Sequence, residues 1–173
     1  KDVEELVQVK KSDVDELKED NESKADYIES LEEELKYYKN YAESISNTMT
    51  EDKLQMLIDK EWTYTLSVNG ISFPKNGVLE MSASDFELIL KEEKAPYSVL
   101  SEENQQKGRI ESTLAQAISS NAGETKLKEQ DLIQEVVVSY KDLEKGSTVS
   151  IKIHEDVQKK LGLETTDLKI QLK

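Results

Sequence analysis

The chain has 173 residues, of which 36% are hydrophobic and 35% are charged, so part of it is expected to be solvated on most faces. Its 23 basic and 37 acidic residues give a net charge of −14, which would repel nucleic acid, because affinity for phosphate backbones depends mainly on Lys and Arg. It has no cysteine, which excludes disulfides, thiol nucleophiles and thiolate metal sites.

Residues 3–49 contain neither Gly nor Pro, and their hydrophobic residues recur with a period of seven. One row of this repeat reads Val7, Val14, Asn21, Ile28, Leu35, Ala42 and Met49. The second row reads Val3, Lys10, Leu17, Lys24, Leu31, Tyr38 and Ile45. Eleven of these fourteen positions are apolar, which predicts a coiled coil in which both rows form the seam between helices.

The composition of the seam favours a parallel homodimer. The first row has β-branched residues at Val7, Val14 and Ile28, and the second has leucines at Leu17 and Leu31. Asn21 stands where a buried amide commonly fixes the register of two parallel helices. In a parallel pair the flanking residue Asp13 would face Lys18 of the second copy, and Glu34 would face Lys39.

Three other arrangements stay open at this point. Lys10 and Lys24 interrupt the second row, which keeps a trimer or an antiparallel pair possible. A single amphipathic helix packed on its own domain would also show an apolar stripe, but a helix of this length spans about 70 Å, more than a domain of the remaining size could cover.

Four tyrosines lie within fifteen residues of this helix, at Tyr27, Tyr37, Tyr38 and Tyr41. Tyr38 falls in the seam and Tyr27 and Tyr41 flank it, so they could widen the contact between helices. Because tyrosine is enriched at protein interfaces, Tyr27, Tyr37 and Tyr41 also form a possible patch for another partner.

The long helix is expected to end near residues 46–50. Thr48 and Glu51 have the spacing of a capping box, which predicts that a short connecting helix begins there and runs to residue 61. The predicted organisation is therefore a coiled-coil segment at 1–49, a connecting helix at 50–61 and a head domain at 62–173.

From Trp62 the hydrophobic pattern changes to a period of two, which indicates strands. Residues 63–68 and 71–73 flank Asn69-Gly70, the preferred two-residue hairpin turn, and further strands are expected at 78–82 and 86–90. These segments predict an antiparallel meander.

Residues 91–130 are polar and poor in β-branched residues, so we expect a long polar loop. Within it Ile110, Leu114, Ala117 and Ile118 fall at helical spacing and predict one short helix. The rest of the chain predicts strands at 133–140, 148–153 and 168–172 and a short helix at 155–161. The predicted fold class is α+β: a long N-terminal coiled-coil helix, then a small, mainly antiparallel strand-rich domain.

Residues 145–170 resemble the strand, short helix, Leu-Gly-Leu turn and strand of AbrB-type swapped-hairpin regulators. This part is under a fifth of the chain. It lacks the proline after the first strand and the DNA-facing arginines of that family, so no residue role is carried over from the resemblance.

Chemical motifs are scarce. The single histidine, His154, stands at the end of a predicted strand and has no cysteine to form a relay with. The chain has no phosphate-cradling glycine loop and no HExxH motif, and none of its many acidic residues forms a calcium-loop pattern. We therefore predict a non-enzymatic protein with no catalytic residue, no cofactor and no metal ion.

The leading functional hypothesis is an oligomeric binding, sensing or scaffold module, in which a coiled-coil stalk presents a small head domain to an unknown protein or cell-surface partner. The order of stalk and head, the missing start methionine and the absence of cysteine suggest the extracytoplasmic part of a membrane-anchored protein, although a cytoplasmic location is compatible with the same features. The alternative is a virion or phage structural protein, in which a stalk and a strand-rich head commonly occur as trimers.

Overall fold

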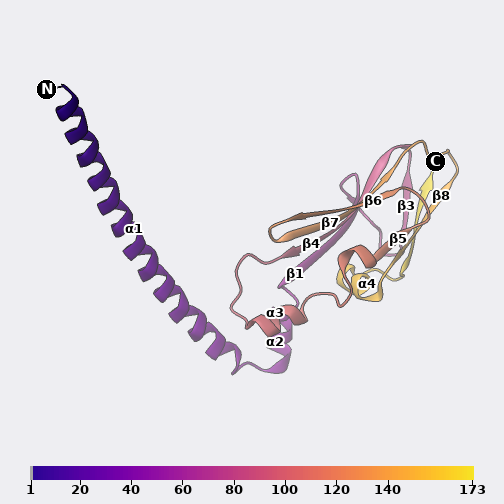
Figure 1. Cartoon of the computed structure of the whole chain (residues 1–173). Coiled ribbons are helices and arrows are strands. Elements are labelled where there is room, and N and C mark those ends of the chain that lie inside the picture. Colours follow the sequence, from indigo (N-terminus) through magenta and orange to yellow (C-terminus); the bar gives the residue numbers. More distant parts are fainter. Residues whose placement is uncertain (1) are drawn as a thin grey trace. The chain divides into compact units, whose positions relative to one another are not determined.

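The computed structural model describes residues 2–173 and is shown in Figure 1. The chain divides into two compact units, Lys1–Met49 and Thr50–Lys173, which are described separately. The fold class is α+β, as the sequence predicts: a long N-terminal helix precedes an antiparallel strand-rich domain with a few short helices.

The first unit is a single helix, α1 (Asp2–Ser46). It is uninterrupted because the segment has no Gly or Pro and is rich in Glu, Lys and Leu, which favour helix. It ends in a tightened turn, in which the amides of Thr48 and Met49 donate to the carbonyls of Ile45 and Ser46.

The second unit begins with helix α2 (Glu51–Ile58). The capping box predicted from Thr48 is wrong, because Thr50 is the residue that precedes the helix and the Thr48 hydroxyl donates to the Ile45 carbonyl instead. The helix also ends at Ile58, three residues before the predicted end.

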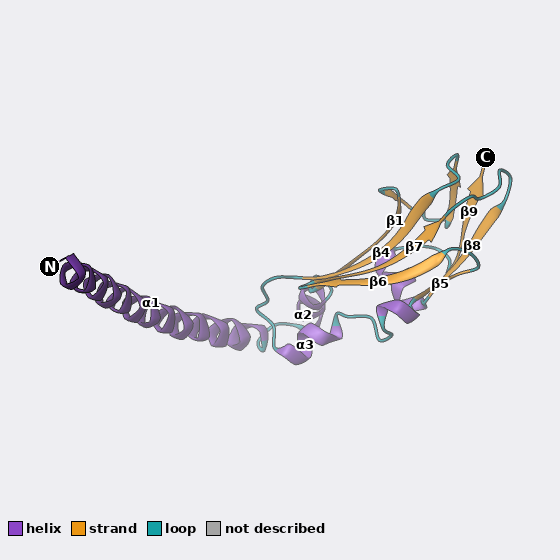
Figure 2. Ribbon diagram, turned by 45° about the horizontal axis from the view of Figure 1, so that its top comes forward, coloured by secondary structure: helices purple, strands orange, loops and turns teal. Residues whose placement is uncertain are grey.

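Five antiparallel strands form one sheet of the second unit. Figure 2 shows the four longer ones side by side. Asn69 and Gly70 both have positive φ, as the predicted two-residue turn between the first two strands requires. In spatial order the strands are β2 (Ile71–Ser72), β1 (Trp62–Val68), β4 (Phe86–Lys94), β7 (Ile133–Tyr140) and β6 (Glu124–Gln130).

Four strands form a second sheet, in the order β3 (Val78–Met81), β9 (Asp167–Leu172), β8 (Thr148–Ile153) and β5 (Ile118–Ser120). The predicted meander is wrong at β3, which leaves the first sheet and runs parallel to β9 at the far end of the chain. Alternation of apolar residues marks β3 as a strand but carries no information about its neighbour.

One hydrophobic core is shared by the two sheets. Alternate residues along β1, β8 and β9 are buried, as the period of two predicts, and their side chains belong to a single contiguous cluster. The largest fully buried apolar side chains of the unit are Tyr140, Leu88, Leu90, Leu100, Leu114, Ile151, Leu168 and Ile170.

The structure differs from the long loop expected at 91–130. This stretch contains the end of β4, helix α3 (Glu102–Lys107), a 3-10 turn η1 (Leu114–Gln116), and strands β5 and β6. The four residues expected in one helix are all buried, but they lie in a loop, the 3-10 turn and β5. Sequence patterning missed β6 because all seven of its residues are exposed and show no apolar alternation.

The C-terminal elements agree with the sequence. Helix α4 (Glu155–Leu161) follows β8 and ends at Gly162, which has the left-handed φ of 67° that suits glycine. His154 is the N-cap of this helix, and its Nδ1 accepts a hydrogen bond from the Asp156 amide at 3.3 Å. The histidine is exposed at the end of a strand, as expected.

Candidate functional site

A polar row crosses the core-facing side of the five-stranded sheet. Tyr64 lies opposite Glu92, and Glu92 lies opposite Gln134. Gln134 in turn lies opposite Glu129, so the row spans β1, β4, β7 and β6. The Tyr64 hydroxyl donates to Glu92 Oε2 at 2.6 Å, and Gln134 Nε2 donates to Glu129 Oε1 at 3.1 Å. The next row of side chains on the same side of this sheet is apolar, so each polar group in this row needs a hydrogen-bond partner within the row or from a nearby loop.

Arg109 completes the row from the loop that follows α3. Its Nε and Nη2 donate to Glu92 Oε1 at 3.1 and 2.8 Å, and Nη2 also donates to Gln134 Oε1 at 3.5 Å. The guanidinium carbon lies 4.7 Å from the centroid of the Trp62 ring. A planar guanidinium can stack on an aromatic ring and donate in its own plane at the same time, which lysine cannot do.

Two further hydrogen bonds attach the Arg109 segment to the sheet. The Ile110 amide donates to the Tyr64 hydroxyl at 3.1 Å, and the Trp62 indole donates to the Gln105 carbonyl at 3.0 Å. Both of these side chains lie on β1, so β1 holds the segment in place in addition to the bonds that Arg109 makes to Glu92 on β4.

The electrostatics of the row follow from burial. Glu92 is only 1% exposed, and both of its carboxylate oxygens accept hydrogen bonds. The hydrogen bonds to this carboxylate raise the pKa of Arg109 above its usual value, and burial, followed by the hydrogen bond to Glu92, raises the pKa of Tyr64. At neutral pH Arg109 is thus a fixed cation and Tyr64 a neutral donor.

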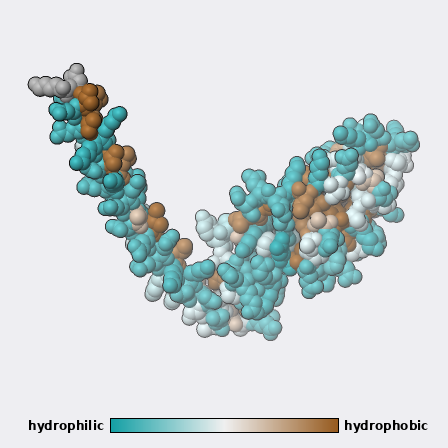
Figure 3. All heavy atoms as spheres, in the orientation of Figure 1, coloured by the Kyte–Doolittle hydropathy of each residue, from teal (hydrophilic) through white to brown (hydrophobic). Residues whose placement is uncertain are grey.

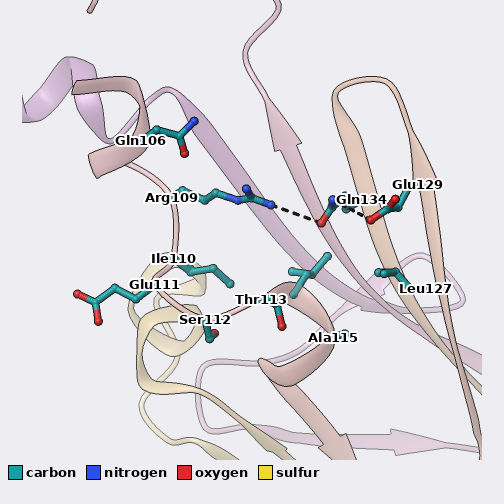
Figure 4. A pocket seen from close by; sticks show the side chains of 11 residues that line it. Gln106, Arg109, Ile110, Glu111, Ser112, Thr113, Ala115, Leu127, Glu129 and Gln134 are labelled. Carbon is teal, nitrogen blue, oxygen red and sulfur yellow. Dashed lines mark hydrogen bonds between the residues drawn. The ribbon is translucent and has the colours of Figure 1, made fainter. Parts of the chain in front are cut away.

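A pocket of about 540 Å³ borders this network (Figure 4). Its wall includes Arg109, Gln134 and Glu129, joined by the two hydrogen bonds drawn, together with Leu127 on β6. Leu127 is 47% exposed although it pairs with the fully buried Val136, so the core-facing side of β6 is partly uncovered. The remaining lining residues are Gln106, Ile110, Glu111, Ser112, Thr113, Leu114 and Ala115.

A second pocket, of about 550 Å³, shares Arg109, Ile110 and Glu111 with the first. Its eight lining residues include four basic and three acidic side chains, so it carries no strong excess of either charge. Lys160 lies 5.9 Å from the centroid of the Tyr64 ring. The other lining residues are Asp59, Lys107, Asp156 and Lys159.

Two buried polar atoms near these elements have no hydrogen-bond partner among the described residues. One is the hydroxyl oxygen of Ser112, which lines the first pocket. The other is Oε2 of Glu61, whose Oε1 accepts a hydrogen bond from the Ser98 hydroxyl. The first pocket combines hydrogen-bonding side chains with the apolar Ile110, Leu114 and Leu127, which suits reversible binding of a polar group.

The second candidate surface is the face of α1 that carries the predicted seam. The structure places the predicted interface residues on this one helix, except for Met49, which lies beyond its end. The large apolar ones on the helix are exposed by between 43% for Ile45 and 72% for Val3. Figure 3 shows these hydrophobic side chains as a broken stripe along α1. Asn21 is also exposed, and Ala42 is half-buried.

The four tyrosines of α1 are exposed as well, each by more than half. Tyr37 and Tyr38 lie edge to face, with ring centroids 5.6 Å apart and an interplanar angle of 74°. Tyr27, Tyr37 and Tyr41 thus remain available to a partner, and Tyr38 to the seam.

Sequence reasoning missed the network around Glu92 altogether. One signal was present: Arg109 is the only arginine and Trp62 the only tryptophan of the chain, and they stack on each other. Glu92 itself is one of 37 acidic residues, and nothing in its neighbours along the chain distinguishes it.

Comparisons with protein-family models, with curated proteins and with solved structures find no match to this chain. Within residues 2–173 no helix combines the length and the apolar character needed to cross a membrane. The same residues contain no group of three or more His, Asp or Glu side chains placed to hold a metal ion.

Proposed function

We propose that this protein is a non-enzymatic, homo-oligomeric module, in which α1 pairs with a second copy as a coiled coil and residues 50–173 form a binding or scaffold domain. The observation that carries the proposal is the row of exposed apolar side chains along the 45 residues of α1. Burying one Val, Leu or Ile side chain contributes about 1.5–3 kcal/mol, so this row gives a large driving force for association.

A second copy of the chain fits this face better than an unrelated partner. The apolar residues repeat every seven positions, and two helices with the same repeat can interdigitate along their whole length. The flanking charges are self-complementary in a parallel pair, since Asp13 would meet Lys18 of the second copy and Glu34 would meet Lys39.

The proposed role of the second unit is to bind a partner through the surface around Arg109. The two pockets that share this residue support the proposal, together with the rigid hydrogen-bonded network that positions its guanidinium. Duplication of the unit by the coiled coil would raise the strength of binding to a multivalent target through effective concentration.

A trimeric virion or phage structural protein is the second candidate. Tyr27 and Tyr41 flank the seam and are exposed, so the apolar face of α1 is wider than two rows. A wider face suits three helices better than two. The mass of the oligomer in solution separates the two proposals.

For location we propose an extracytoplasmic, membrane-anchored protein. The order of coiled coil and head and the absence of cysteine support this proposal, because an exported chain without thiols needs no oxidative folding. Fractionation of cells that produce the protein from its native gene tests it: recovery only with the cytosolic fraction would contradict it.

The test of self-association is sedimentation equilibrium of the full chain and of two lysine variants. Leu31→Lys places a charge in the seam, whereas Ser30→Lys places the same charge one residue away on the outer face of α1. We expect a dimer for the wild type and for Ser30→Lys, and a monomer for Leu31→Lys. A monomeric wild type, or equal behaviour of the two variants, would contradict the proposed function.

A further inference from the structure

We infer that Asp20 and Lys24 form a built-in ion pair that permits a lysine in the seam and, with Asn21, selects the parallel, in-register pairing of two copies. This inference rests on the proposed self-association and adds its orientation and the residues that determine it. It starts from a conflict in the sequence: in a parallel pair each seam residue faces its own copy, so two Lys24 ammonium groups would meet.

The structure shows how this conflict is resolved within one helix. Lys24 Nζ lies 2.7 Å from Asp20 Oδ2, one helical turn earlier. Asp20 occupies the position beside the seam, so its carboxylate draws the ammonium group out of the seam. The aliphatic stem of Lys24 can then cover apolar surface while its charge stays at the edge and neutralised.

The partner helix leaves room for this pair. In a parallel dimer a residue beside the seam faces the residue five positions later in the second copy. Asp20 would therefore face Ala25, whose small side chain neither blocks the ion pair nor competes for either charge. The same rule brings Asp13 to Lys18, Tyr27 to Glu32 and Glu34 to Lys39, so no like charges meet along these flanks.

The main competitor is an antiparallel pair in which Asn21 faces Lys24 of the second copy. On one flank that register places Asp13 beside Glu34 at two symmetric positions, and each such contact sets two carboxylates against each other. On the other flank it places Lys11 beside Glu32 and Glu4 beside Lys39, so it also gains contacts between opposite charges. Because Asp20 already neutralises Lys24, the antiparallel pair gains little from its Asn21 contact. The flanking charges therefore do not separate the two arrangements, and the preference for the parallel pair rests on Asn21, which meets its own copy only in the parallel register.

Lys10 defines the weak part of the seam. Among the described residues it has no ion pair, unlike Lys24. In the parallel dimer the two Lys10 side chains approach each other without compensation, so the part of the coiled coil before Asn21 should separate more readily than the part after it.

The first experiment measures the dimer dissociation constant of the full chain by analytical ultracentrifugation. A dimer contains two of these ion pairs, and each contributes up to about 0.5 kcal/mol. Asp20→Asn should therefore raise the dissociation constant roughly fivefold. Asp26→Asn removes the same charge from the outer face of α1 and should leave the constant unchanged or slightly lower. In a Lys24→Leu background Asp20→Asn should have no such effect.

The outcomes separate the inference from the function on which it rests. If Asp20→Asn behaves like Asp26→Asn, or weakens the dimer equally in the Lys24→Leu background, the role of the ion pair is wrong while self-association stands. A wild type that is monomeric overturns the proposed function itself.

The second experiment tests orientation by disulfide cross-linking, which the absence of native cysteine makes simple. Ile28→Cys should cross-link with itself at high yield, because residue 28 faces residue 28 only in the parallel register. When Val14→Cys and Leu31→Cys chains of different mass are refolded together, disulfide cross-links should join only two chains of the same kind. A cross-linked product containing one chain of each kind would show the antiparallel pair and overturn the inference.

Discussion

Arg109, the only arginine of the chain, lies 4.7 Å from the ring of Trp62, the only tryptophan, and donates two hydrogen bonds to the buried carboxylate of Glu92. These contacts connect the loop after α3 to two strands of the five-stranded sheet. Because the contact includes the single tryptophan, its fluorescence reports directly on this part of the fold.

Arg109→Ala should destabilise the second unit by about 3 kcal/mol, because it leaves Glu92 as a buried charge without its cation. The measurement is urea unfolding followed by Trp62 fluorescence. Lys107→Ala removes an exposed lysine two residues away, whose pair with Glu103 is solvated, and should change stability by less than about 0.5 kcal/mol. Equal effects of the two variants would show that Glu92 does not depend on Arg109.

Tyr64 should make the protein less stable in alkaline solution. Burial and the hydrogen bond to Glu92 raise its pKa, so the folded state favours the neutral phenol and the unfolded chain loses this proton first as the pH rises. The stabilising contribution is complete below about pH 10, the usual tyrosine pKa, and falls as the pH rises above it. Unfolding free energies at about pH 9 and 11 should show a larger alkaline loss for wild type than for Tyr64→Phe.

Tyr140 provides a second test of the same effect, because burial raises its pKa as well. Tyr140→Phe should therefore remove a separate part of the alkaline loss, and the double variant should lose least of all. If Tyr64→Phe lost as much stability as wild type over this range, the raised pKa would not contribute to folding.

Asn21→Leu should raise the thermal stability of the oligomer and broaden the distribution of its masses. Burial of an amide in the seam costs stability but restricts partner and register, and leucine removes both effects. Thermal melting and sedimentation velocity measure the two consequences. A single unchanged species with a lower melting temperature would contradict the proposed seam.

Residues 50–173 should fold alone and remain monomeric. The unit contains its own core, whereas the proposed association surface lies on α1. A shorter fragment, 62–173, lacks α2 and its buried Ile58, whose carbonyl closely approaches Gly108, and should be less stable. Circular dichroism and light scattering check both fragments, and an unfolded 50–173 fragment would show that the two units depend on each other.

Low pH and added salt should both stabilise helix formation by residues 1–49. Residues 1–49 contain seven basic and 15 acidic residues, so more than half of the acids there have no basic partner, and protonation near pH 4 or screening by salt relieves their repulsion. This is opposite to ordinary acid unfolding, in which paired carboxylates lose their partners on protonation. Helical signal against temperature measures the effect; earlier melting in acid and in salt would show that specific ion pairs outweigh the net repulsion.

The sequence by itself determined the elements whose signal is local. The long helix follows from a segment without Gly or Pro, and the first hairpin follows from Asn69-Gly70 between alternating strands. Gly162 likewise marks the end of α4. The parallel coiled coil also comes from the sequence, but it remains a prediction, because one copy of the helix cannot show what covers its apolar face.

Only the tertiary structure decided how strands pair and which polar residues meet. β3 pairs with β9, although most of the second unit's sequence lies between them. β6 is a strand because β7 supplies its hydrogen bonds, although none of its side chains is buried. The site at Arg109 depends on Glu92, which is 17 residues away, and on Trp62, which lies on a third segment. Periodicity reports only which side of an element is apolar. Partners distant in the chain are selected by packing of the whole core, which no local pattern records.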